Sequence, residues 1–199
     1  MEPQQVAASY DRLAARWSGP QFDRRNGIAQ HERVIQFTVR RGTALDVGCG
    51  SSGRIIDLLI ERGFEPEGVD LSSEMLRLAR SRHPHVRFHL ADICTWELSK
   101  HYEFISAWDS IWHVPLSSQR AVLQKLCTAL SPGGVFIFTT GGVQSPDERR
   151  DRSMGEPMYH AAIGIPEVLQ TILQSGCTCC HLEYDQYPES HVYVIAQRI

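Results

Sequence analysis

The chain has 199 residues, of which 42% are hydrophobic and 22% are charged, and its formal net charge is −3. This length predicts one domain with a single hydrophobic core, and the small net charge argues against nucleic acid or an anionic membrane as a partner. No apolar run approaches the roughly 18 residues of a membrane-spanning helix, and the first residues lack the apolar segment of a secretory signal. We expect a single-domain, cytoplasmic protein.

Helices and strands are expected to alternate along most of the chain. Apolar residues at helical spacing predict helices over 4–17 and 27–38, ahead of the core. The core strands are expected at 43–47, 66–70, 86–90, 102–108 and 134–140. The helices between them are expected at 52–63, 73–82 and 117–130. This alternation predicts an α/β fold, with a parallel sheet and helices on both faces.

The pattern changes after Thr140. Residues 141–165 show no periodicity, and we expect an irregular loop there, because long structureless stretches are usually functional or mobile. A helix over 166–175 and two strands joined by a turn at 186–190 complete the chain. The two strands predict a hairpin at the edge of the sheet, with the last strand antiparallel.

The cysteines predict reduced, structural thiols. Cys177, Cys179 and Cys180 lie close together in the sequence, but no second Cys or His pair follows at zinc-site spacing. We therefore expect no metal site.

The segment "LDVGCGSSG" follows the first core strand and raises the question of its ligand. Gly48, Gly50 and Gly53 form a G-x-G-x-x-G pattern, which is typical of dinucleotide-binding loops. Asp46 lies two residues before this pattern, where its charge would repel a pyrophosphate and would favour a cationic ligand. The next two strands are also followed by acids, Asp70 and Asp92. These suit a ribose diol and an adenine amine, respectively.

At this point the chain resembles the class I S-adenosylmethionine-dependent methyltransferases. The resemblance rests on "LDVGCGSSG", "GVDLSSEML", "ADI", "SAWDSIWHVP" and "LSPGGVFIFT", and it is good over about 40–140. The chain departs from the family at Ser52, where a third glycine is usual. The family implies a Rossmann-like, doubly wound seven-stranded sheet of order 3-2-1-4-5-7-6. We expect a single domain, 1–199, that consists of N-terminal helices forming a lid (1–40), a cofactor-binding core (41–140), a substrate-side loop (141–165) and a C-terminal helix and hairpin (166–199).

The resemblance implies S-adenosylmethionine as the cofactor and S-adenosylhomocysteine as the product. Asp70 would bind the ribose, Asp92 the adenine amine, and the backbone near Trp108 the methionyl amine. The full expected cofactor set is Asp46, Gly48, Cys49, Gly50, Asp70, Leu71, Met75, Ala91, Asp92, Ile93 and Trp108.

Residues for the acceptor come from other segments. A base for the proton of the nucleophile is expected among Asp109, His113 and His160. The segment "GEPMYHAAI" resembles a stretch of small family members, which implies that Met158 and Tyr159 line the acceptor pocket. Tyr10 and Trp17 resemble lid residues, although as a helical apolar stripe they could equally belong to the core.

A small-molecule acceptor is expected, since the chain has no Asn/Asp-Pro-Pro-Tyr, no Pro-Cys and no long basic arm. The acceptor atom and the oligomeric state stay open. Two alternatives also stay open: a nicotinamide-dependent oxidoreductase and a non-catalytic S-adenosylmethionine-binding protein.

Overall fold

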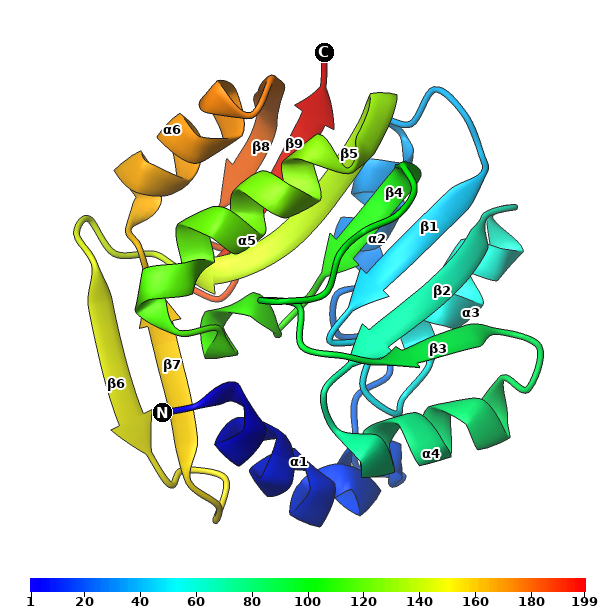
Figure 1. Cartoon of the computed structure of the whole chain (residues 1–199), viewed down its shortest axis with the longest axis vertical. Coiled ribbons are helices and arrows are strands. Elements are labelled where there is room, and N and C mark those ends of the chain that lie inside the picture. Colours follow the sequence, from blue (N-terminus) through cyan, green and yellow to red (C-terminus); the bar gives the residue numbers. More distant parts are fainter.

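A twisted seven-stranded sheet forms the centre of the protein, in a computed structural model that describes residues 1–199 (Figure 1). Its strands are β1 (Thr43–Val47), β2 (Glu65–Asp70), β3 (Arg87–Leu90), β4 (Tyr102–Ala107), β5 (Leu130–Gly141), β8 (Cys177–Glu183) and β9 (His191–Arg198). They lie in the order β3-β2-β1-β4-β5-β9-β8, and only β9 runs antiparallel to its neighbours. Numbered within this sheet alone, the order is 3-2-1-4-5-7-6, which confirms the predicted fold.

Helices cover both faces of this sheet. The helices are α1 (Pro3–Ser18), α2 (Ile28–Ile35), α3 (Arg54–Glu61), α4 (Ser73–Arg82), α5 (Leu116–Thr128) and α6 (Ile165–Gln174), with a short 3₁₀ helix η1 (Ile111–His113). Buried side chains of α5 and α6 join one apolar cluster, and those of α2 and α3 join a second cluster on the opposite face. Alternate residues of the central strands supply the two clusters, as a sheet buried on both faces requires.

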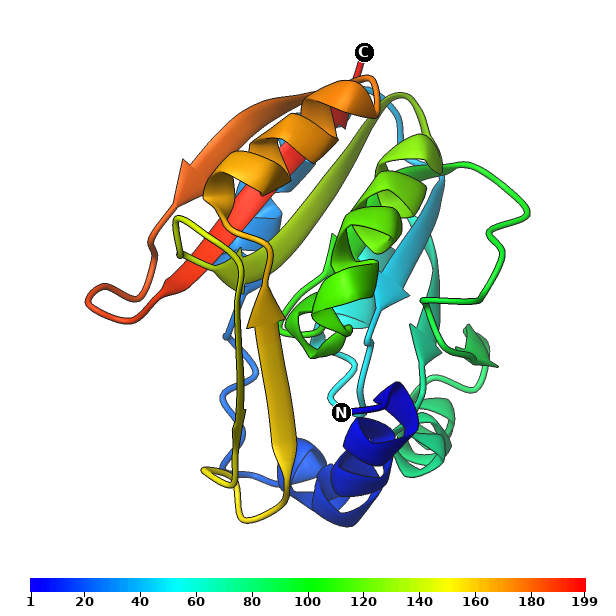
Figure 2. The same cartoon turned by 60° about the vertical axis from the view of Figure 1, so that its left-hand side comes forward.

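The expected loop over 141–165 is a β-hairpin instead. Strand β6 (Asp147–Asp151) pairs antiparallel with β7 (Met158–Ala162), and the two form a separate two-stranded sheet. The sequence of β6 is "DERRD", and four of its five residues are exposed, so it carries none of the apolar alternation that reveals a strand. Figure 2 shows this hairpin extending from the main sheet toward α1.

Helix α1 lies below the carboxyl ends of the parallel strands, next to β7 and α4 (Figures 1 and 2). Polar contacts hold it there. Its Ser9 hydroxyl donates to the Pro157 carbonyl at 2.8 Å, and the Ser18 hydroxyl donates to Ser51 at 2.8 Å. Its Asp11 carboxylate accepts from the Ser72 hydroxyl at 2.6 Å. None of the helices is long and apolar enough to cross a bilayer.

Candidate active site

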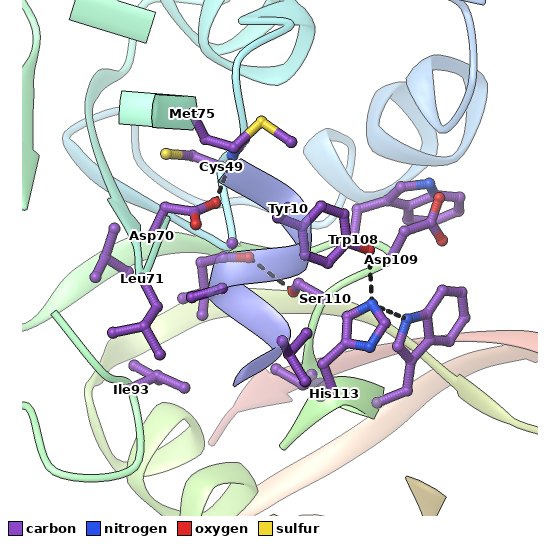
Figure 3. A pocket seen from close by; sticks show the side chains of 18 of the residues that line it. Tyr10, Cys49, Asp70, Leu71, Met75, Ile93, Trp108, Asp109, Ser110 and His113 are labelled. Carbon is purple, nitrogen blue, oxygen red and sulfur yellow. Dashed lines mark hydrogen bonds between the residues drawn. The ribbon is translucent and has the colours of Figure 1, made fainter. Parts of the chain in front are cut away.

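A cavity of about 370 Å³ lies beyond the carboxyl ends of β1, β2 and β4, where ligands bind in open α/β sheets (Figure 3). The glycine loop and the segments after β2, β3 and β4 form its floor, and α1 and the β6–β7 hairpin contribute to its walls. Its volume falls within the range of small-molecule sites.

The two first glycines of the loop have different roles. Both have left-handed φ values, +68° at Gly48 and +57° at Gly50. A Cβ on Gly48 would lie 2.3 Å from the Cβ of Ser110, whereas a Cβ on Gly50 would meet no protein atom within 4 Å. Gly48 therefore permits close packing against the segment after β4. Gly50 leaves room for a ligand to approach the backbone.

Asp70 ends β2 and lines the cavity. One of its carboxylate oxygens accepts from the Gly50 N–H at 2.9 Å, and the other accepts from the Ser72 N–H at 2.8 Å. Burial raises the pKa of this carboxyl above its usual value, while these backbone hydrogen bonds act in the opposite direction. Leu71 and Met75 line the same part of the wall, as Figure 3 shows. The carboxylate is thus fixed in place beside an apolar surface.

The segment after β3 forms the neighbouring wall. Asp92 lines the cavity together with Ala91, Ile93 and Cys94, and its carboxylate accepts from the Cys94 N–H at 2.9 Å. Behind this loop, the Lys125 ammonium donates to the carbonyls of residues 93, 94 and 96 at 2.7, 3.2 and 2.9 Å. Helix α5 therefore sets the position of the loop that carries Asp92.

Asp46 does not line the cavity, which corrects the expectation that three acids converge on one ligand. Leu45 and Val47 belong to the cluster under α5, so Asp46 between them points to the opposite face of the sheet. Its side chain is 4% exposed, and burial raises the pKa of its carboxyl to about 7. Asp46 is therefore not in a position to contact the ligand directly.

A cation without an acidic partner lies at the end of the cavity near the glycine loop. The Arg54 guanidinium donates to the Asn26 carbonyl at 2.8 Å and to the Ser52 hydroxyl at 2.9 Å. No carboxylate lies within 4.0 Å of it. Burial lowers its pKa, and the more distant charges of Asp46 and Asp109 act in the opposite direction. A half-buried, unpaired guanidinium of this kind suits the carboxylate of a ligand.

Asp109 lies at the same end and is held from two sides. It has a left-handed φ of 54°, and its backbone N–H donates to the Thr139 hydroxyl at 2.8 Å. One carboxylate oxygen accepts from the Asn26 amide at 3.2 Å, and the other is 3.1 Å from Nε2 of His191. The opposite nitrogen of His191 is hydrogen-bonded to Asp185.

This pairing favours the charged form of His191. Burial alone lowers the pKa of His191, but the hydrogen bonds to Asp109 and Asp185 outweigh it, and the pKa is raised above its usual value. The Asp109 carboxylate accepts only from the Asn26 amide and faces the His191 ring, so it keeps acceptor capacity toward the cavity that it lines. Asp109 can therefore accept a cationic group such as an ammonium.

His113 is fully engaged in hydrogen bonds. Its Nδ1 donates to the Tyr159 carbonyl at 2.7 Å, so Nε2 is the acceptor. Nε2 receives the Tyr10 hydroxyl at 2.7 Å and the Trp112 indole N–H at 3.1 Å, two bonds that Figure 3 draws. Burial lowers the pKa of His113 to about 4, so the ring is neutral.

His160, on β7, also lines the cavity, but unlike His113 it is not saturated with hydrogen bonds. Its Nδ1 has no hydrogen-bond partner and lies 3.4 Å from a carboxylate oxygen of Asp151. Its ring packs against those of His113 and Trp112, with centroids 4.9 and 6.2 Å away. Burial lowers the pKa of this imidazole as well.

The expected acceptor residues are only partly in the cavity wall. Tyr10 and Trp17 of α1 line it, as do Cys49 and Trp108 among the expected cofactor residues. Met158 and Tyr159 do not, because both are buried in a small cluster with Val6 and Ala161. Alternation along β7 explains this for Tyr159, which lies on the face opposite to His160. Met158 shares the face of His160 but is fully buried. The Tyr159 hydroxyl instead bonds Glu148 at 2.6 Å.

Several lining residues were not expected from the sequence, namely Asn26, Arg54, Ser110, Trp112 and Met154. Arg54 could have been found, because it occupies the first turn of the helix that follows the glycine loop. Asn26 and the His191–Asp185 pair come from distant segments, and no local pattern marks them.

Comparison with protein families and curated proteins identifies relatives. A family model described as a methyltransferase domain matches residues 7–172. The chain is 34% identical over 171 residues to malonyl-[acyl-carrier protein] O-methyltransferase of Salmonella typhimurium, which covers 82% of this chain and 64% of the relative. It is 34% identical over 176 residues to trans-aconitate 2-methyltransferase of Rhodopseudomonas palustris, covering 81% and 66%. The chain thus spans just under two thirds of the length of each relative.

Solved structures agree in fold. The CcbJ methyltransferase from Streptomyces caelestis superposes with a TM-score of 0.75 over 99% of both chains, at 16% identity. DhpI in complex with S-adenosylhomocysteine gives 0.73 over 98% of this chain and 96% of that one, at 19% identity. Identities this low show a shared fold.

Proposed function

Because the chain belongs to the methyltransferase-domain family, we propose that it transfers the methyl group of S-adenosylmethionine to a small-molecule acceptor. One observation carries the proposal. The cavity presents the Arg54 guanidinium and the Asp109 carboxylate at one end, and the two fixed carboxylates of Asp70 and Asp92 at the other. This arrangement complements an amino-acid head group joined to an adenosine.

Each part of the cofactor has matching groups. Arg54 would hold the methionyl carboxylate and Asp109 the ammonium, beside the open backbone of Gly50. Asp70 would accept the ribose hydroxyls, with Leu71 and Met75 against the adenine. Asp92 would accept the adenine amine. When bound, the cofactor supplies an electrophilic methyl group, so the protein needs mainly to position the acceptor.

A small-molecule acceptor agrees with the relative named for trans-aconitate, whereas the other relative is named for a malonyl group carried on an acyl-carrier protein. The family model, both relatives and the CcbJ structure are described as methyltransferases, so the nicotinamide alternative is not taken forward.

Calorimetric titration with S-adenosylhomocysteine tests the proposal. The parent should bind, and Asp70→Asn should weaken binding by roughly 30- to 150-fold, since a charge-assisted hydrogen bond contributes about 2–3 kcal/mol. Asp147→Asn is the matched control, because Asp147 is exposed on β6. Equal affinity of parent and Asp70→Asn would refute the assignment. Binding without turnover of any acceptor would favour a non-catalytic binding protein.

A further inference from the structure

No Lys, Arg, Asp or Glu side chain lines the acceptor end of the cavity. It is built from α1, η1 and the β6–β7 hairpin, and its wall includes Val6, Ala7, Tyr10, Trp112, Met154 and His160. The one cationic side chain of the whole cavity wall, Arg54, is bonded to Ser52 and Asn26 beside the glycine loop. Both histidines at the acceptor end have lowered pKa values.

Arginines near this end are engaged elsewhere. Arg12 forms an ion pair with Glu156 at 2.7 Å, and Arg16 donates to the Met154 carbonyl at 3.1 Å. Neither lines the cavity. An acceptor with several carboxylates would lose its hydration here without gaining a counter-charge, and that desolvation is strongly unfavourable.

The free nitrogen at this end belongs to His160. Both nitrogens of His113 are occupied, by the Tyr159 carbonyl on one side and by Tyr10 and Trp112 on the other. His160 makes no side-chain hydrogen bond, and Asp151 stands 3.4 Å behind its Nδ1. An imidazole backed by a carboxylate can take up a proton at Nε2 and keep the resulting charge stabilised.

We propose, on the basis of the proposed function, that the acceptor is an uncharged, apolar molecule that presents a phenol O–H, a thiol S–H or a ring N–H. His160 accepts that proton at Nε2, and Asp151 stabilises the imidazolium. The electron pair of the broken X–H bond stays on the acceptor atom X (oxygen, sulfur or nitrogen), which uses it to bond the methyl carbon. The electron pair of the C–S bond returns to sulfur. His160 then releases the proton to solvent.

The charges around His160 agree with this role. From β6, Asp151 raises and Arg149 lowers its pKa, and from η1 the ring of His113 is neutral. Burial is the largest influence and leaves His160 neutral near pH 7, as a base must be. The ionisable hydroxyl of α1 at this end, Tyr10, is bonded to His113.

The test has two stages. Binding of S-adenosylhomocysteine is measured first by calorimetry, and its absence would refute the proposed function itself. The loaded protein is then titrated with catechol, thiophenol and benzimidazole, and with trans-aconitate and malonate. We expect at least one uncharged compound to bind and both carboxylates to fail. Binding of a carboxylate, or of none of the uncharged compounds, overturns the inference and leaves cofactor binding intact.

Variants then test His160 in methyl transfer to the compound that binds, followed by mass spectrometry. His160→Gln should lower kcat by roughly 10²- to 10⁴-fold with unchanged affinity for S-adenosylhomocysteine. Asp151→Asn should retain more activity and should move the acid limb of the pH profile to lower pH. The exposed His85→Gln and Asp147→Asn are the matched controls. Parent-like kcat in His160→Gln, or an unmoved acid limb in Asp151→Asn, would contradict the assignment.

Discussion

His191, the first residue of the last strand, holds the carboxylate of Asp109 at the cavity through a contact of 3.1 Å. The two residues are 82 positions apart in the chain. The contact therefore couples the stability of the C-terminal hairpin to the charge state of the cavity.

Replacing this histidine should give a pH-dependent loss of stability. Because the pKa of His191 is raised in the folded protein, the contribution of its charge is complete below the unfolded value of about 6.5 and is lost as pH rises through the folded pKa. His191→Asn should lower the free energy of unfolding by about 2–3 kcal/mol at pH 5.5, and the difference should shrink toward pH 9. Urea unfolding across this range measures it. A difference that grows with pH would contradict the protonated bridge.

Removing the unpaired guanidinium should affect only ligands that carry an amino-acid head group. Arg54→Met should weaken S-adenosylhomocysteine by about 10- to 100-fold, the value of one or two charge-assisted hydrogen bonds. Methylthioadenosine lacks the carboxylate, and its affinity should change by less than about twofold. Calorimetry with both ligands separates these cases. Equal losses for the two ligands would place Arg54 elsewhere.

Replacing Lys125, unlike replacing Arg54, should weaken the binding of both ligands. It does not line the cavity, but its ammonium holds three carbonyls of the loop after β3. Lys125→Met should weaken S-adenosylhomocysteine and methylthioadenosine by the same factor, because both need the adenine wall. It should also lower the melting temperature, since three half-buried carbonyls lose their donor. Loss confined to S-adenosylhomocysteine would be inconsistent with this role.

The two glycines of the loop should differ when each is replaced by alanine. Either change forces a left-handed residue and costs roughly 1–2 kcal/mol. Gly48→Ala also drives a Cβ into Ser110, which adds about 1–3 kcal/mol of overpacking. Unfolding experiments should therefore find Gly48→Ala the less stable variant. Gly50→Ala should keep more stability and lose more cofactor affinity, and the reverse order would refute the division of roles.

The fold was predictable because its core strands and helices carry strong local signals. The strand 43–47 and the helix 73–82 have the predicted bounds, and Ser72 caps this helix by accepting from the Met75 N–H. Strand β6 could not be found, because its stability comes from pairing with β7 rather than from burial of apolar residues. The order of the strands came from the family resemblance, which the structure confirms.

The site residues that could be predicted are those that directly follow a recognisable strand or loop motif. Asp70 and Asp92 follow their strands directly and line the cavity. The prediction that Asp46 faces the ligand could have been corrected from the sequence. Alternation along the strand places its side chain on the face of the sheet opposite to that of Leu45 and Val47. The link from His191 to Asp109 depends on the antiparallel register that pairs His191 with Gly141, and no neighbouring residue in the sequence signals that register.

The β6–β7 hairpin forms a sheet of its own and shares no ladder with the seven strands. Its side chains can therefore be exchanged without breaking a backbone bond of the main sheet. A new acceptor could be accommodated by altering this one appendage, while the nucleoside-binding half keeps its geometry.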